Sequence, residues 1–145
     1  MTYRWQEHTS ELQLHIDAAS EPAVFEEAAA AFAELADENT ESELAEQGAE
    51  GPAGEAEAVV REVVAVAGDR PALLAAFLEE LVYLLETDDL VPERIDHIAL
   101  TDDGLTATLH GRRSRPRHLV KGVTYNELTF AREGERYTAT VVLDV

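Results

Sequence analysis

Residues 11–35 read ELQLHIDAASEPAVFEEAAAAFAEL, a strand pattern followed directly by a helix pattern. Leucine and isoleucine alternate with polar residues over 11–17, which predicts a strand with one buried face. Ser20 precedes a glutamate and a proline, as is typical of a helix N-cap. Apolar residues then recur at helical spacing, so we expect an amphipathic, alanine-rich helix over residues 21–36.

The downstream sequence repeats this order and then turns to strands alone. Residues 59–66 are rich in valine and predict a strand, and residues 70–86 carry the widest apolar stripe of the chain and predict the central helix. Four strand-like segments follow at 95–100, 105–111, 118–130 and 136–143. We therefore expect one α+β domain over residues 1–145, with a mixed or antiparallel sheet and two helices packed on one face.

Residues 37–57 differ from the rest in composition. They hold eight acids and no base, together with three glycines and a proline. Such a stretch buries little apolar surface, so we expect an acidic, flexible loop here.

The charge balance is strongly acidic. Acids outnumber bases 30 to 11, which gives a formal net charge of −19, and Lys121 is the single lysine. Self-repulsion of this size destabilises a compact state, and molar salt screens it. The composition therefore favours a halophilic source with a salt-loaded cytoplasm.

Several classes of protein are excluded or disfavoured by composition. The chain has no cysteine, which excludes disulfides, thiolate metal sites and cysteine nucleophiles. No apolar run approaches the roughly 20 residues that span a bilayer, and the first residues lack a signal-peptide pattern. We expect a cytoplasmic protein with no membrane partner.

Two short segments hold groups that suit hard metal ions. Residues 7–11 read EHTSE at the start of the first alternating strand, and the sequence closes on a strand with Asp144 and Val145. Adjacent carboxylates at this end raise one another's pKa unless a cation lies between them, and oxygen ligands of this kind suit Ca²⁺ or Mg²⁺. The simpler interpretation is a polar strand start and a last strand that closes the sheet.

Residues 112–121 form a basic strip, with five bases and no acid. The strip is either a surface for RNA or a protein partner, or a counter-charge to neighbouring acids. Composition slightly favours the counter-charge, because molar salt steeply weakens binding to phosphates.

Four blocks in this order resemble the archease family: EHTSELQL at 7–14, FLEELVYL at 77–84, VKGVTY at 120–125 and VLDV at 142–145. The resemblance implies duplicated strand–helix–strand–strand modules. It also implies a non-enzymatic accessory protein of the RtcB-type RNA ligase, which joins tRNA halves with GTP and Mn²⁺. Such a protein promotes guanylylation of the ligase and its multiple turnover, and it meets tRNA only through the ligase.

The resemblance also implies a divalent cation, most simply Ca²⁺, at one tip of the domain. The implied ligands are Glu11, Asp144 and the terminal carboxylate of Val145. The family has an aspartate where this chain has Glu11, and Ca²⁺ tolerates the longer side chain better than Mg²⁺. The family's motif lysine corresponds to Lys121, and we assign activation of the ligase to Lys121 and His8.

Two other functions stay open from the residues alone. A small metal-dependent hydrolase would use Glu11 and Asp144 around the ion, but His8 is the only plausible general base beside them. An RNA-binding module would use residues 112–121, and its affinity would fall steeply with salt.

Overall fold

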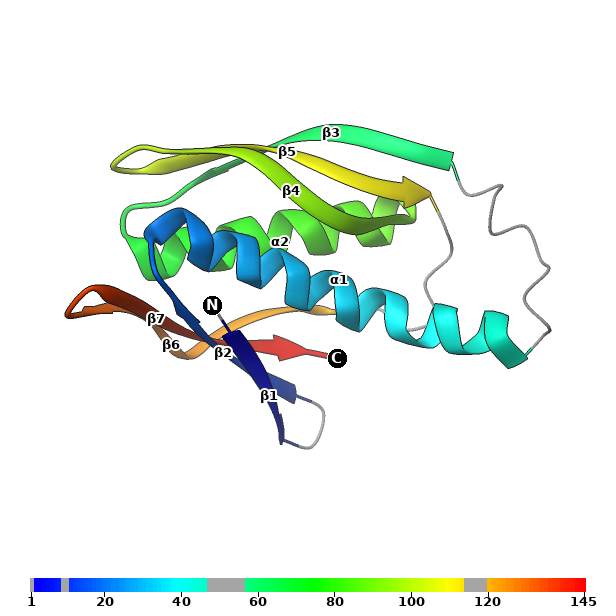
Figure 1. The fold of residues 1–145 in the computed structure, drawn as a ribbon, viewed down its shortest axis with the longest axis horizontal. Helices are drawn as coiled ribbons and strands as arrows, with labels where there is room; N and C mark the ends of the chain where they lie inside the picture. Colours follow the sequence, from blue (N-terminus) through cyan, green and yellow to red (C-terminus); the bar gives the residue numbers. More distant parts are fainter. Residues whose placement is uncertain (1, 9–10, 47–56, 114–119) are drawn as a thin grey trace.

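The computed structural model describes residues 2–8, 11–46, 57–113 and 120–145, with the backbone alone for 5–8, 37–46 and 57. Within these ranges the chain forms two helices and seven strands (Figure 1). In chain order they are β1 (Thr2–His8), β2 (Glu11–Ala18), α1 (Glu21–Glu46), β3 (Glu57–Val66), α2 (Arg70–Asp88), β4 (Leu90–Leu100), β5 (Gly104–Arg113), β6 (Gly122–Glu133) and β7 (Arg136–Asp144).

The strands form two antiparallel sheets with the two helices between them (Figure 1). One sheet has the strand order β1-β2-β7-β6, and the other has the order β3-β5-β4. Helix α1 packs against β4 and β2, while α2 packs against β6 and β3. Along the chain, the unit β3-α2-β4-β5 is inserted between the two parts of a second unit, which consists of β2-α1 and β6-β7. Each unit has the expected order strand, helix, strand, strand.

Helix α1 begins where the sequence predicts and ends later. The Ser20 hydroxyl accepts a hydrogen bond from the Ala23 N–H at 3.3 Å, which caps the first turn. The predicted loop over 37–57 is wrong in its first part, because the helix continues to Glu46. Alanine, glutamate and leucine are strong helix formers, and the first glycine comes only at Gly48. Residues 47–56 lie outside the described part of the chain.

Helix α2 is fixed by caps at both ends. Asp69 accepts from the Ala72 N–H at 2.9 Å, and a proline occupies the first turn. Asp89 ends the helix in the left-handed region, with φ 51° and ψ 34°, and its N–H bonds to the Leu84 carbonyl. The apolar stripe that predicted this helix is buried, at Leu73, Leu74, Ala75, Phe77, Leu78, Leu81, Val82, Leu84 and Leu85.

A shared core joins both helices to the four-stranded sheet. Phe25 of α1 is fully buried, and its ring centroid lies 5.7 Å from Phe77 of α2 and 5.9 Å from Phe130 of β6. Small residues on α1, such as Ala28 and Ala29, are also buried and allow close approach of neighbouring elements. Leu105 and Leu109 of β5 belong to the same buried cluster, so the layer between the sheets is packed from both sides.

The α+β class, the two helices and the antiparallel strands confirm the expected fold. The division into two sheets was not foreseen, because alternation shows which strands exist and not which strands pair. Strand β1 was also missed, since its sequence, TYRWQEH, has no clean alternation of apolar and polar residues. Among the described helices, none is long and apolar enough to cross a membrane.

Candidate metal and ligand sites on the four-stranded sheet

The predicted site residues meet in one row at one end of the four-stranded sheet. In the strand register, His8 of β1 lies opposite Glu11 of β2, Glu11 lies opposite Asp144 of β7, and Asp144 lies opposite Gly122 of β6. Directly opposite residues of antiparallel strands have Cα atoms roughly 4.5–5.5 Å apart and share a face. Segments from both ends of the sequence are therefore adjacent here.

Glu11 and Asp144 lie on the face of this sheet that turns away from the helices. The alternate positions, Leu12 and Leu143, are opposite each other, and Leu143 is fully buried in the core. Both acids are half-buried, and among the described residues neither carboxylate has a hydrogen-bond or ion-pair partner. Two adjacent anions without a cationic partner repel each other, and a bound cation relieves that repulsion.

Lys121 is attached to the same row through its backbone. Its N–H donates to the carbonyl of Asp144 at 2.7 Å, just before β6 begins at Gly122. The preceding Val120 is fully buried, so the backbone on both sides of Lys121 is held while its side chain is exposed. The lysine of the VKGVTY block is thus beside the penultimate acid.

The donor set fits a hard divalent cation. Two side-chain carboxylates face the same side, and Val145, whose carboxylate is the third ligand implied by the resemblance, follows Asp144 directly. Ca²⁺ takes six to eight oxygens, so solvent would complete the shell. In the described ranges, no three histidine or acidic side chains lie close enough to hold a metal ion. A cation at Glu11 and Asp144 would therefore need the carboxylate of Val145 as its third protein ligand.

His8 and part of the basic strip are only partly described. The backbone of His8 lies in the row, but its side chain falls outside the described part of the structure. Arg112 bonds to Glu93 at 3.1 Å, and Arg113 donates to the Asp88 carbonyl at 3.1 Å. Arg112 thus pairs with an acid, as the counter-charge interpretation expects, while Arg113 contacts a backbone carbonyl. Residues 114–119 lie outside the described chain.

A chain of hydrogen bonds crosses the same outer face, next to the row. The Gln13 amide nitrogen donates to Glu127 at 2.7 Å, and Glu127 is exposed at an irregular point of β6 with φ 62°. The Gln13 oxygen lies 3.0 Å from His15 Nε2, and Thr140 Oγ1 lies 3.3 Å from His15 Nδ1. Because the Gln13 amide nitrogen donates to Glu127, the Gln13 atom beside His15 is an oxygen, which can only accept a hydrogen bond. We therefore assign the Nε2–H tautomer to His15, with Thr140 donating to Nδ1.

The protonation state of His15 follows from its surroundings. Burial lowers the pKa of His15 from its ordinary value, and the positive charge of Arg4 lowers it further. The negative charge of Glu127 acts in the opposite direction and does not cancel the other two. His15 is therefore neutral at pH 7, in agreement with the assigned tautomer.

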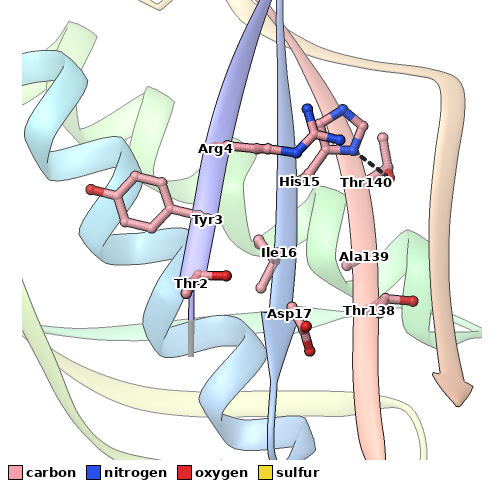
Figure 2. Close-up of a pocket in the computed structure, with 9 residues that line it drawn as sticks. All are labelled: Thr2, Tyr3, Arg4, His15, Ile16, Asp17, Thr138, Ala139 and Thr140. Atoms are coloured by element: carbon pink, nitrogen blue, oxygen red, sulfur yellow. Dashed lines mark hydrogen bonds between the residues drawn. The ribbon is translucent and has the colours of Figure 1, made fainter.

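A pocket of about 320 Å³ opens beside this histidine (Figure 2). It is formed where β1, β2 and β7 run side by side. Its lining residues are Thr2, Tyr3, Arg4, His15, Ile16, Asp17, Thr138, Ala139 and Thr140. Sequence reasoning did not single out this pocket, because Arg4, His15 and Thr140 meet only through strand pairing. The one local signal was the alternation that places His15 on the polar face of its strand.

Comparison with known proteins identifies relatives along the whole chain. The model of the archease protein family (MTH1598/TM1083) matches residues 3–145. The protein archease of Methanosarcina barkeri is 28% identical over 153 residues, covering 99% of this chain and 95% of its own. The protein archease of Methanosarcina mazei is 27% identical over 152 residues, with the same coverage.

Two solved structures share the fold. Protein 1598 of Methanobacterium thermoautotrophicum, solved in solution, aligns with a TM-score of 0.69 and 25% identity. That alignment covers 99% of this chain and 98% of the other. A crystal structure from Thermotoga maritima, described as an archease and possible chaperone, aligns with a TM-score of 0.60 and 19% identity. It covers 100% of this chain and 98% of the other, and at this identity it supports the fold alone.

Proposed function

Since this chain belongs to the archease protein family, we propose that it is a non-enzymatic activator of an RtcB-type tRNA-splicing RNA ligase. In this role it acts in the cytoplasm, promotes guanylylation of the ligase and sustains multiple turnover. The observation that carries the proposal is the row at the end of the four-stranded sheet. It brings the opening block, the VKGVTY block and the last strand together around Glu11, Asp144 and Lys121.

The row supports a cation-bearing tip. Glu11 and Asp144 occupy opposite positions on one face, without a partner among the described residues. With the terminal carboxylate of Val145 they would hold Ca²⁺, which would order the last residue against the start of β2 and reduce the repulsion at this end. The ion would thereby give the ligase a defined surface to bind.

Lys121 would act beside this tip as a contact to the ligase. Its backbone is fixed to Asp144, and its exposed side chain is free to reach a partner. A lysine ammonium is a compact, flexible point charge, whereas the ten arginines of this chain carry a planar fork. His8 lies in the same row and is the second residue that we assign to activation.

The activator role is tested by measuring guanylylation and turnover of the ligase with and without this protein, in molar KCl. We expect the ligase alone to stop near one turnover and the mixture to continue. Lys121→Met should lower the stimulation while the protein stays folded, and Arg94→Met, on the other sheet, serves as the matched control. Equal turnover with and without the protein would refute the activator role.

The cation site is tested separately by calorimetric titration with Ca²⁺. Asp144→Ala should abolish binding, and so should one residue added after Val145, because it displaces the terminal carboxylate. Glu11→Asp should bind Ca²⁺ at least as well as the unmodified protein. Asp102→Ala, in the exposed turn between β4 and β5, is the control. Unchanged binding by Asp144→Ala would show that the ion is held elsewhere.

A further inference from the structure

Arg4 is distinctive among the arginines of this protein. In the described parts of the chain, every other arginine bonds to a carboxylate or a carbonyl, while Arg4 has neither. Acids outnumber bases 30 to 11, so a cation without a partner is unexpected here. Arg4 also lines the 320 Å³ pocket, where Figure 2 shows its side chain on the same part of the sheet as those of His15 and Thr140.

Among the described residues that line this pocket, the one acid is already neutralised. Asp17 accepts a hydrogen bond from Arg136 Nε at 2.7 Å, across β2 and β7. Hydroxyl groups supply much of the remaining polar lining, from Thr2, Thr138 and Thr140. The Thr138 hydroxyl donates to Glu133 at 3.3 Å, so its hydrogen is not available to a ligand. Arg4 is then the main hydrogen-bond donor that lines the pocket. Within the described part of the chain, the pocket thus combines an unpaired guanidinium with hydroxyls and no unpaired acid.

We propose that this pocket binds a tetrahedral oxoanion, the chemistry of a phosphate group, on the guanidinium of Arg4. A guanidinium presents several N–H donors in one plane and binds phosphate oxygens in pairs. The site differs from the cation site in place and in charge. His15 and Thr140 are each four residues along their strand from Glu11 and Asp144, or about 13 Å at the rise of a strand. This inference does not depend on the proposed function.

The hydrogen-bond chain behind the pocket couples the anion to a proton. In the neutral state, Thr140 gives its hydroxyl hydrogen to His15 Nδ1. When His15 takes up a proton, both ring nitrogens become donors, so Thr140 must accept from Nδ1 and its hydroxyl hydrogen becomes available. A bound anion then gains a second donor and a nearby positive charge.

The direction of this coupling follows from the charges around His15. Arg4 on β1 opposes protonation of the ring, and Glu127 on β6 favours it. Asp17 on the same strand is offset by Arg136 on β7. An anion at Arg4 would neutralise the group that opposes protonation. Oxoanion binding and proton uptake therefore favour each other, and the affinity should increase as the pH falls.

Sulfate is the probe of choice, because its charge does not change over the working pH range. The titration is followed by the backbone amide and histidine-ring NMR signals of the full chain, in KCl at constant ionic strength. We expect saturable shifts at Arg4, His15 and Thr140, with tighter binding at pH 6 than at pH 8. Uptake of one proton limits this change to about tenfold per pH unit.

Three variants separate the site from general charge effects. Arg4→Gln should weaken sulfate binding by about tenfold or more, since it removes a charge-assisted hydrogen bond. His15→Gln should still bind sulfate at pH 8 but lose the pH dependence. Arg94→Gln, an exposed arginine paired with Asp96 on the other sheet, should bind like the unmodified protein.

Inorganic phosphate and adenosine monophosphate, compared at one pH, distinguish the source of the anion. Tighter binding of the nucleotide would identify a nucleotide phosphate as the ligand, and equal binding would identify the free anion. Absence of saturable shifts, or equal affinity of Arg4→Gln and the unmodified protein, would overturn the site. Equal affinity at pH 6 and pH 8 would overturn the coupling to His15.

Discussion

Replacement of Phe25 by alanine should destabilise the whole domain, because this ring joins α1 to both α2 and the four-stranded sheet. Phe25 is fully buried, with an edge-on contact to Phe77 at 5.7 Å and a tilted contact to Phe130 at 5.9 Å. Core Phe→Ala changes cost about 3–5 kcal/mol, and aromatic pairs add to the cost of lost burial. With two pairs lost, we expect a decrease of about 4 kcal/mol in the free energy of unfolding.

Urea is the suitable denaturant, since a guanidinium salt would itself screen the charges of this acidic chain. Unfolding in molar KCl is followed by circular dichroism and by the fluorescence of Trp5, the only tryptophan. A loss of about 4 kcal/mol corresponds to a melting temperature lower by roughly 8–16 °C for a domain of this size. Val60→Ala is the control, because Val60 is 61% exposed and should change stability by no more than about 0.5 kcal/mol.

The two probes also test whether residues 1–145 unfold as one domain. Because the helices form a single layer between the sheets, the two transitions should coincide in the unmodified protein and in Phe25→Ala. A loss below about 1 kcal/mol, or separate transitions for the two probes, would refute the reasoning that one core serves both sheets.

Three further perturbations have definite expected outcomes. Stability should increase from low to molar KCl because salt screens the net charge of −19, and equal melting temperatures in the two buffers would contradict the halophilic interpretation. Burial and the hydrogen bond to Glu34 raise the pKa of Tyr3 to about 12 from 10.0. The protonated Tyr3 hydroxyl therefore stabilises the folded state below pH 10, and this stabilisation is lost as the pH rises to about 12. Tyr3→Phe should therefore lose less stability than the unmodified protein over this alkaline range, as measured by urea unfolding. A side chain at Gly111 would meet the Val91 carbonyl oxygen at 2.5 Å, so Gly111→Ala should cost about 1–3 kcal/mol in thermal unfolding, whereas Gly68→Ala, with open space around it, should not.

The sequence predicted elements better than it predicted their partners. The alternation over 11–17 and the apolar stripe of 70–86 are local signals, and both elements formed as expected. The acids of 37–46 suggested a loop, but intrinsic helix preference continued α1 through them. The division into two sheets depends on strand pairing between distant segments, and composition carries no information about it.

The candidate sites show the same limit. The blocks around Glu11 and Asp144 are visible in the sequence, although only the register shows that the two residues are directly opposite. The pocket beside His15 depends on contacts between strands, such as the one with Thr140, 125 positions away in the chain. An arginine without an acceptor is also invisible until its neighbours are known.

Whether the cation site activates the ligase is tested most directly by multiple-turnover RNA ligation, measured against free Ca²⁺ at a fixed Mn²⁺ concentration. The unmodified protein and Asp144→Ala are compared in molar KCl, with circular dichroism to show that both are folded. We expect ligase stimulation by the unmodified protein to increase with Ca²⁺ and to saturate at the concentration that fills its calorimetric site. Asp144→Ala should stay folded and give no stimulation at any Ca²⁺ concentration. Full stimulation by Asp144→Ala would show that the cation site is not needed for activation of the ligase.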